Sequence, residues 1–229
     1  TERGNYVYKF AHTGKRERPM EATVREIVSP LTAQVHMPYV PGDFGRSFCR
    51  GQTTKDSDIA TDARPEAVQK LFTRSYAVGA HFGVIVVLEN GLQFEVAAFR
   101  SDGAYLDGRH PTEVHFSSPE EDAARRDFTI NGMFFDPATD QVIDYVGGRM
   151  DLEARLIRAI GDPAQRFAED RLRMLRAVRF ATVLEFEIEP ATWSALVANA
   201  PSINEISAER IREELVDDDV SQRIGRDGV

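Results

Sequence analysis

The chain has 229 residues, and its 28 Lys and Arg against 37 Asp and Glu leave a formal net charge of −9 at pH 7. That length is enough for one large domain or two small ones with a hydrophobic core. The hydrophobic content of 42% is ordinary for a soluble globular protein. Taken over the whole chain, the acidic balance argues against a nucleic-acid-binding protein, but its distribution matters more than its sum. Arginine gathers in one short stretch, at Arg166, Arg171, Arg173, Arg176 and Arg179.

Cysteine content and hydropathy indicate in which cellular compartment the protein works. The single cysteine, Cys49, excludes an internal disulfide framework and suits a reducing environment. No apolar run approaches the roughly 20 residues that a transmembrane helix needs, and the N-terminus lacks the apolar region of a signal peptide. We therefore expect a cytoplasmic protein that does not enter a membrane.

The N-terminal part of the chain predicts a leader, a helix and a strand. Residues 1–19 are polar without a sustained period, as in a disordered leader or tag. The apolar spacing of residues 21–31 predicts a helix, which Pro30 should end or kink. Residues 35–40 predict a short strand, and a glycine-containing turn at 42–46 follows it. A turn between a strand and a helix can cradle phosphate with its backbone N–H groups.

Two carboxylates, Asp56 and Asp58, directly precede the strand-like pair Ile59-Ala60. If both acids lie on a strand, the period of two puts their side chains on one face, about 7 Å apart. Acids at that separation can share two hard cations about 4 Å apart, as in two-metal phosphoryl transfer. Such Asp pairs are also common in surface loops, so the pattern alone is a weak signal.

The next segment predicts a helix and a hairpin. Residues 65–72 form an amphipathic run with Pro65 in its first turn. Residues 83–88 and 92–99 predict two strands joined by a turn. Glu95 is an acid inside the second strand, where a charge is unexpected. It is either an edge residue that faces water or a third acid beside the Asp pair.

Residues 101–119 predict a long loop, and long loops inside compact domains are usually functional or disordered. A helix with acids in its first turn should begin at residue 120 and run into Arg125-Arg126-Asp127. The plainest interpretation of those three residues is an ion-paired helix face in solvent. Residues 134–146 predict a second hairpin, and Gly147-Gly148 then marks a boundary.

Beyond that boundary the pattern is helical throughout. The sequence thus predicts a disordered leader at 1–19, an α+β domain at 20–148, an all-helical domain at 149–216 and a disordered tail at 217–229. The helices are predicted at 151–159, 163–185, 190–200 and 207–216.

Four motifs agree with one family in order and spacing. They are Lys55–Thr61, Phe94–Arg100, Arg125–Asn131 and Glu169–Phe180. Together they resemble the class II tRNA nucleotidyltransferases and bacterial poly(A) polymerases over roughly residues 21–216. The resemblance implies a polymerase-β-like nucleotidyltransferase head domain followed by a helical neck. It also implies addition of C and/or A, from CTP and ATP, to the 3′ end of tRNA by two-metal nucleotidyl transfer.

The resemblance assigns roles to residues in the head. Asp56 and Asp58 would hold Mg²⁺, with Glu95 as a further acid beside the metal site. Arg126 would contact the triphosphate, and Asp127 would lie near the ribose. Gly42 and Arg46 match the family's nucleotide-binding turn.

The neck motif resembles a protein template that reads the incoming base. Asp170 and Arg173 are three residues apart, so we expect them on one helix face. An Asp acceptor and an Arg donor can pair with the polar edge of C or A, while the shape of the pocket rejects G and U. Arg176 and Arg179 would continue the stripe toward the triphosphate. A charged, solvated helix face is the alternative.

Two features depart from the family pattern. The family's turn is usually Gly-Gly-x-x-Arg-Asp, whereas this chain has Asp43 in place of the second glycine and Ser47 in place of the acid. We expect the carboxylate of Asp43 to weaken nucleotide binding, because it stands where phosphate should approach the backbone. Family enzymes also continue past the neck into body and tail helices, whereas this sequence ends at Val229.

Three functions stay open at this point. The first is an enzyme that adds C and A, or A alone, to tRNA, and the second is a poly(A) polymerase with the same head and neck. The third is a non-catalytic module that binds nucleotide or RNA. The motifs do not separate the first two, and the oligomeric state is not readable from the sequence.

Overall fold

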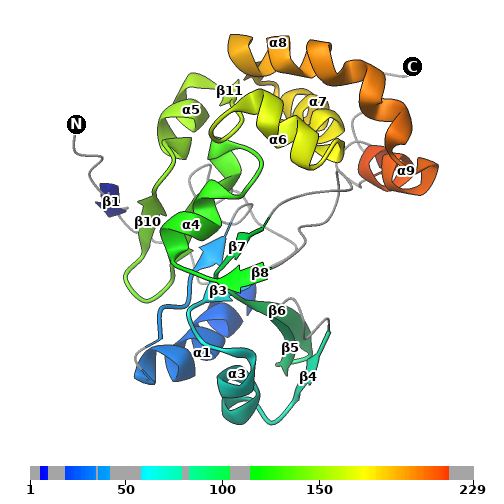
Figure 1. Ribbon diagram of the computed structural model, residues 1–229. Helices are drawn as coiled ribbons and strands as arrows, with labels where there is room; N and C mark the ends of the chain where they lie inside the picture. Colours follow the sequence, from blue (N-terminus) through cyan, green and yellow to red (C-terminus); the bar gives the residue numbers. More distant parts are fainter. Residues whose placement is uncertain are drawn as a thin grey trace, which may run out of the picture. The chain divides into compact units, whose positions relative to one another are not determined.

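The computed structural model of the chain (Figure 1) describes residues 6–9, 19–34, 36–41, 58–78, 83–103 and 114–216. Their contacts divide the chain into two units. The first unit comprises residues 1–101, 114–125 and 131–146, and the second comprises 102–113, 126–130 and 147–229. The second unit thus takes a short segment, 126–130, from the stretch that the sequence assigns to the α+β domain.

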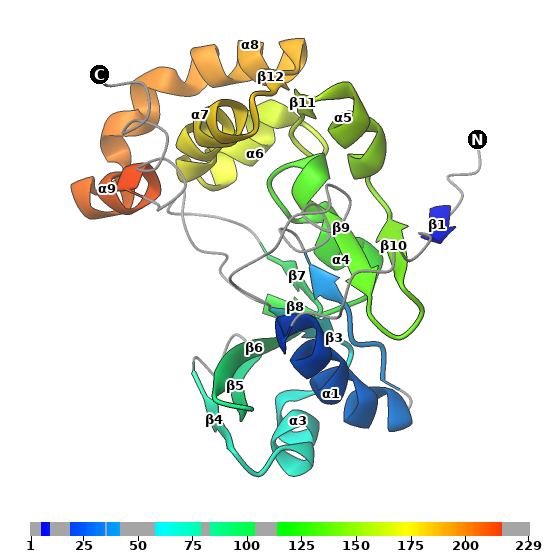
Figure 2. The ribbon, with the colours of Figure 1, turned by 180° about the vertical axis from the view of Figure 1, so that it is seen from behind.

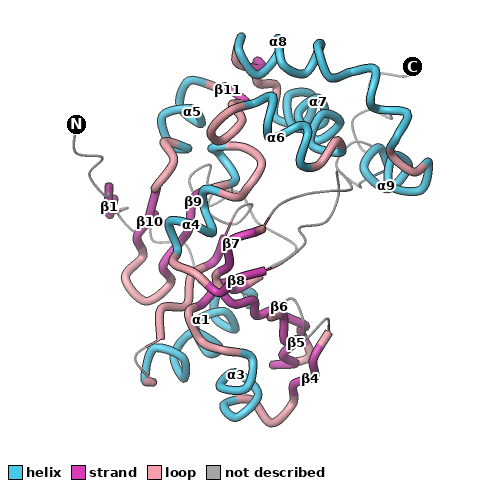
Figure 3. Tube along the Cα trace, viewed as in Figure 1, coloured by secondary structure: helices cyan, strands magenta, loops and turns pink. Residues whose placement is uncertain are grey.

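A four-stranded mixed sheet forms one half of the first unit. Its strand order is β3 (Ile59–Thr61), β6 (Leu92–Ala98), β5 (Val84–Glu89) and β4 (Ser75–Ala77), of which β4, β5 and β6 are labelled in Figure 3. Strand β3 pairs with β6 in parallel, and the other pairs are antiparallel. The predicted hairpin is confirmed. Its turn uses Asn90 and Gly91 at φ 50° and 78°, the left-handed conformation that a tight hairpin requires.

The helices α1 (Pro19–Ala33) and α3 (Pro65–Leu71) belong to the N-terminal part of this unit. Helix α1 buries Val24, Ile27, Val28 and Leu31, which confirms the predicted apolar spacing. Of the two effects predicted for Pro30, an end of the helix is not observed, because the helix continues to Ala33, and a kink stays a prediction. Pro30 lies in the last turn, where its missing N–H removes one backbone hydrogen bond and little helix remains to be broken.

A second, antiparallel sheet has the order β1 (Tyr6–Lys9), β10 (Gln141–Asp144), β9 (Met133–Asp136) and β2 (Val40–Pro41). The hairpin of β9 and β10 confirms the one predicted at 134–146. The strand predicted at 35–40 is shorter than expected, since regular pairing begins only at Val40. Tyr39 instead bridges Ala60 through two backbone hydrogen bonds of 2.7 Å, which tie β3 to this region.

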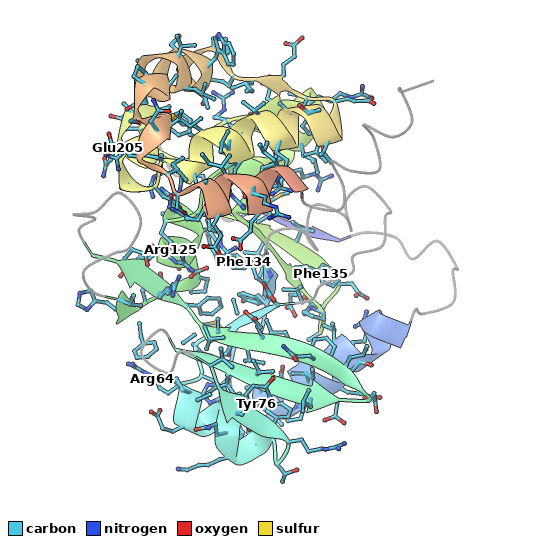
Figure 4. The ribbon with its side chains drawn as sticks, turned by 90° about the vertical axis from the view of Figure 1, so that its right-hand side faces the viewer. Arg64, Tyr76, Arg125, Phe134, Phe135 and Glu205 are labelled. Carbon is cyan, nitrogen blue, oxygen red and sulfur yellow. The ribbon has the colours of Figure 1, made fainter. Side chains whose placement is uncertain are left out.

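An aromatic cluster fills the core near this bridge. Phe99 and Phe134 are buried, with ring centroids 5.8 Å apart in an edge-to-face arrangement. Tyr39 lies 5.9 Å from Phe99, and Tyr145 lies 6.4 Å from Phe134, so the cluster joins four segments distant in sequence. Figure 4 labels Phe134 and its neighbour Phe135 on β9.

The segment predicted as a long loop is partly ordered into a ribbon. Its ends form β7 (Arg100–Asp102) and β8 (Val114–Phe116), which pair with each other, while residues 104–113 lie outside the described part of the chain. Helix α4 (Pro119–Ala124) follows, and the Ser118 side chain caps it by accepting from the Glu121 N–H. This helix is shorter than predicted and ends before the two adjacent arginines.

The second unit, shown from behind in Figure 2, is helical with one small sheet. The two-residue strands β11 (Leu156–Ile157) and β12 (Glu187–Ile188) pair in parallel, which corrects the all-helical prediction. The helix predicted at 163–185 is in fact two helices. The helices are α5 (Gly148–Ala154), α6 (Pro163–Glu169), α7 (Leu172–Leu184), α8 (Pro190–Asn199) and α9 (Ala208–Val216).

Among the described helices, none has the length and apolarity needed to cross a membrane. The tail predicted at 217–229 lies outside the described residues. The observed mixture of helices and sheets agrees with the α+β class expected from the sequence.

Candidate active site

Two of the predicted acids, Asp58 and Glu95, lie at the parallel strands β3 and β6: Asp58 directly precedes β3, and Glu95 is in the middle of β6. Ile59 of β3 is in register with Val96 of β6, so the residues just before them, Asp58 and Glu95, stand beside each other. Both side chains are exposed, whereas Ile59 and Val96 are buried. Glu95 is not an edge residue, because β6 lies between β3 and β5.

The donor atoms at this place suit a hard divalent cation, which prefers carboxylate oxygens. Within the described residues, no three His, Cys, Asp or Glu side chains gather closely enough to hold a metal ion. Asp56 lies outside the described residues, and it is the acid that the sequence predicts as the partner of Asp58. The nucleotide turn with Gly42 and Arg46 also lies outside them, so the weakening expected from Asp43 stays a prediction.

The two adjacent arginines belong to different units. Arg125, labelled in Figure 4, is in the first unit, where its Nε donates to Asp122 Oδ1 at 2.9 Å and to the Arg100 carbonyl at 3.0 Å. Asp122 is only 1% exposed and also accepts from the Arg100 N–H at 3.2 Å. Arg125 therefore serves to neutralise a buried carboxylate, and the interpretation of this segment as a solvated helix face does not fit.

Asp127 belongs to the second unit, and its carboxylate is buried. Oδ2 accepts from Nε and Nη2 of Arg176, both at 2.8 Å, and Oδ1 accepts from the Phe128 N–H at 2.7 Å. Burial by itself lowers the pKa of the Arg176 guanidinium, but the carboxylates of Asp127 and Glu214 raise it above its ordinary value. Arg176 is therefore charged at neutral pH and anchored to the segment that carries Arg126.

Helix α9 supplies a second acid to the same cluster. Glu214 is buried, and its Oε1 accepts from Arg179 Nε at 2.5 Å while its Oε2 lies 3.7 Å from Arg176 Nη1. The guanidinium of Arg179 also stacks on Phe180, 4.4 Å from the ring centroid. Arg176 and Arg179 thus form a compact ion-paired cluster with Asp127 and Glu214, and the solvated stripe considered as an alternative is not observed.

The predicted template residues lie at the break between α6 and α7. Asp170 has extended backbone angles (φ −143°, ψ 108°), and its Oδ1 accepts from the Leu172 N–H at 3.1 Å. This side chain ends one helix and starts the next, because a short carboxylate competes for backbone N–H groups. The prediction that Asp170 and Arg173 share one helix face is therefore wrong, although they remain neighbours.

Each template residue is held by a charged partner. Both carboxylate oxygens of Asp170 accept from Arg210 Nη2, at 3.2 and 3.1 Å. Arg173 is 8% exposed, and its Nη1 donates to Glu169 Oε2 at 2.8 Å and to the Arg166 carbonyl at 3.1 Å. These contacts fix the direction of the Asp170 carboxylate, which is an acceptor, and of the Arg173 guanidinium, which is a donor, at the junction of α6 and α7.

Sequence reasoning missed Arg210 and Glu214 as members of this site. They are four residues apart on α9, a spacing that usually indicates a local ion pair on the helix surface. In the structure both reach across to other elements, Arg210 to Asp170 and Glu214 to α7. No local signal in the sequence identifies Glu214 as buried, because its partners on α7 are distant in sequence.

Comparisons with known proteins identify two family models that match this chain. The family described as "Poly A polymerase head domain" matches residues 39–158, and the one described as "Probable RNA and SrmB-binding site of polymerase A" matches residues 185–217. The CCA-adding enzyme of Streptococcus suis is 42% identical over 185 residues, which make up 80% of this chain and 46% of that enzyme.

Solved structures of CCA-adding enzymes are also similar to this chain. The Bacillus stearothermophilus CCA-adding enzyme in complex with CTP is 38% identical with a TM-score of 0.78, over 87% of this chain and 48% of that one. The Thermotoga maritima CCA-adding enzyme complexed with tRNA is 25% identical with a TM-score of 0.72, over 88% of this chain and 47% of that one. This chain therefore spans about half the length of the relatives that it matches.

Proposed function

This chain belongs to the poly A polymerase head-domain family, and on that premise we propose that it transfers C and A residues from CTP and ATP to the 3′ end of tRNA. The observation that carries the proposal is the 42% identity to a CCA-adding enzyme across both units of the chain. The single-cysteine composition agrees with work in the cytoplasm, where tRNA ends are processed.

The acids of the first unit are proposed to hold the metal ions of the reaction. Asp58 and Asp56 would bind Mg²⁺, with Glu95 of β6 beside Asp58. Bound there, Mg²⁺ would lower the pKa of the RNA 3′-hydroxyl and neutralise charge on the α-phosphate. The contribution of the described part of the chain is to hold Asp58 and Glu95 at a parallel strand pair, with both side chains exposed.

The second unit is proposed to read the base. Cytosine and adenine both present an amino donor next to a ring-nitrogen acceptor, whereas uracil and guanine present a carbonyl acceptor next to an N–H donor. An Asp170 acceptor beside an Arg173 donor therefore complements C and A and opposes U and G. Arg210 orients Asp170, and Glu169 orients Arg173, so neither side chain can rotate freely to accept the wrong base.

The remaining charges are proposed to bind the triphosphate. Arg126 follows Arg125 at the point where the chain passes into the second unit, and Arg176 and Arg179 lie on α7 after the template residues. Arg176 and Arg179 are paired with Asp127 and Glu214, which leaves this cluster close to neutral. The ion pairs hold the guanidinium groups in place, so that less side-chain entropy is lost when phosphate binds.

The direct test is incorporation of labelled CTP and ATP, with Mg²⁺, into tRNA that ends before, within and after its terminal CCA. The double variant Asp56→Ala/Asp58→Ala is the control. Ordered addition that stops after the final A would establish the proposed reaction, and addition of A alone after CC would narrow it to an A-adding enzyme. No incorporation above the double variant would contradict it and favour a non-catalytic nucleotide- or RNA-binding module.

A poly(A) polymerase is the second candidate, because both matching families are described by that activity. The same assay separates the two. Long A tracts on any RNA 3′ end would indicate poly(A) synthesis, whereas the proposed enzyme stops after one CCA.

A further inference from the structure

The segment 126–130 joins the second unit through an isolated antiparallel bridge between Phe128 and Ala159, and a 3-10 helix (Thr129–Asn131) begins directly after Phe128. The Ile160 N–H donates to the Asp127 carbonyl at 3.0 Å, and the Thr129 N–H donates to the Arg158 carbonyl at 2.9 Å. Phe128 lies between these bonds, opposite Ala159, and its fully buried ring meets Phe180 edge to face at 5.9 Å. The backbone that carries Asp127 is therefore fixed to the stretch that follows β11.

A buried carboxylate holds the far end of this segment. Asp151, in the first turn of α5, is 7% exposed, and its Oδ2 accepts from Thr129 Oγ1 at 2.7 Å. Arg158 Nε donates to both oxygens of the same carboxylate, at 3.1 and 3.0 Å. Since the Thr129 N–H also donates to the Arg158 carbonyl, one carboxylate sets the position of both sides of the pairing.

The opposite side of this pairing is anchored to α8. Arg158 Nη1 lies 3.3 Å from Glu189 Oε1, and Glu189 caps α8 by accepting from the N–H and the hydroxyl of Thr192 at 2.8 and 2.9 Å. Thr192 is completely buried, and its hydroxyl oxygen accepts from the Ala159 N–H at 3.1 Å. The network is thus continuous from the cap of α8 to Thr129.

We propose that Asp151 is a positioning residue for the nucleotide. Asp151 binds Thr129 and Arg158 and thereby fixes the segment 126–130. Asp127 lies in this segment, two residues before Thr129, and binds Arg176. The inference rests on the proposed function, because it assigns Asp127 and Arg176 to nucleotide binding. Groups that orient a ligand-binding side chain without touching the ligand commonly change affinity by about 10- to 100-fold when they are removed.

The experiment tests the hydrogen bond between Thr129 and Asp151 by substituting each of the two residues. Thr129→Val removes the hydroxyl and keeps the shape of the side chain, Thr129→Ser keeps the hydroxyl, and Asp151→Asn removes the charge. The matched controls are Thr182→Val on the exposed face of α7 and Asp162→Asn at the cap of α6. The readouts are the Kd for CTP by titration calorimetry, the hydrogen exchange of amides 126–130, and the Tm.

We expect Thr129→Val and Asp151→Asn to raise the Kd for CTP about tenfold and to speed exchange at 126–130. Thr129→Ser should restore the affinity to within about twofold. Asp162→Asn should leave the Kd unchanged, because the amide oxygen of Asn can still cap α6, so the loss of a carboxylate elsewhere in this unit does not reproduce the effect of Asp151→Asn.

Failure of the proposed function and failure of the positioning role would give different results. If the unmodified chain does not bind CTP, the proposed function falls and the inference falls with it. If the unmodified chain binds CTP and Thr129→Val binds it equally tightly with unchanged exchange at 126–130, the positioning role alone is overturned. A Kd that rises equally in Thr129→Ser, or in the two controls, would also overturn it.

Discussion

The two units hold their proposed functional side chains in opposite ways. In the first unit, Asp58 before β3 and Glu95 in β6 are exposed, while stability comes from buried apolar residues such as Phe99 and Phe134. In the second unit, Asp127 and Arg173 are themselves buried and ion-paired, and they form part of what holds the helices together.

This difference follows from the chemistry that each unit is proposed to perform. Carboxylates that bind metal must stay accessible and negatively charged, so they gain little from protein partners. Arginines and acids that read a base must point in one direction, and buried ion pairs supply that direction at the cost of desolvation. Substitutions of the proposed functional residues in the first unit should therefore change activity alone, whereas substitutions of those in the second should change activity and stability together.

The largest effect is expected for Asp58→Ala. Nucleotide incorporation should fall by at least about a hundredfold, because a group that stabilises charge in the transition state is lost. The free energy of unfolding should change by less than about 0.5 kcal/mol, because the side chain is exposed. Glu66→Ala, an exposed acid on α3, is the control. A large loss of stability in Asp58→Ala would contradict the separation of the two roles in this unit.

A substitution of the buried acid on α9 should show the opposite behaviour. Glu214→Gln should lower the free energy of unfolding by about 2 kcal/mol, because Arg179 then loses a buried, charged partner. The affinity for CTP should weaken in the same variant. Urea denaturation and calorimetry measure the two effects, and the neighbouring, exposed Glu213→Gln is the matched control. Full stability in Glu214→Gln would mean that the cluster is not structural.

The first unit should be the more sensitive to alkali. Burial, together with the nearby charges of Glu120 and Tyr39, raises the pKa of Tyr145 from 10.0 to about 12. Between those values unfolding releases a proton, so the stability that this group contributes below pH 10 is lost as the pH rises toward 12.

Tyr145→Phe should therefore flatten the fall in stability above pH 10. We expect a difference of about 1 kcal/mol, because solvent screens the half-buried phenol. Thermal unfolding followed at pH 8 to 11 measures it, with the exposed Tyr76→Phe alongside. Parallel curves for Tyr145→Phe and the unmodified chain would contradict the assignment.

The smallest effect on stability is expected at acid pH, from a residue of the second unit. Burial by itself raises the pKa of Glu189, but hydrogen bonds from Thr192 and Ala191 and the charge of Arg158 lower it below 4.5. The stability that Glu189 contributes is therefore present above pH 4.5 and is lost as the pH falls through the lowered value. Glu189→Gln should flatten the acid limb of a Tm profile, whereas the exposed Glu187→Gln should not.

Local patterns in the sequence determined most of the elements and the family. Alternation along residues 92–99, the turn at Asn90-Gly91 and the apolar spacing of α1 each depend on neighbours within a few residues. The motifs around Asp58, Arg126 and Asp170 likewise identify the kind of site, because they are contiguous in the chain.

Only the tertiary structure decided which partners these residues have. It placed Arg125 in one unit and Asp127 in the other, divided the predicted helix at Asp170, and brought Glu214 from α9 to the arginines of α7. The physical reason is that a buried charge requires an opposite charge within a few ångströms, wherever in the chain that partner comes from. Sequence periodicity carries no information about a partner 35 residues away, such as Glu214 for Arg179.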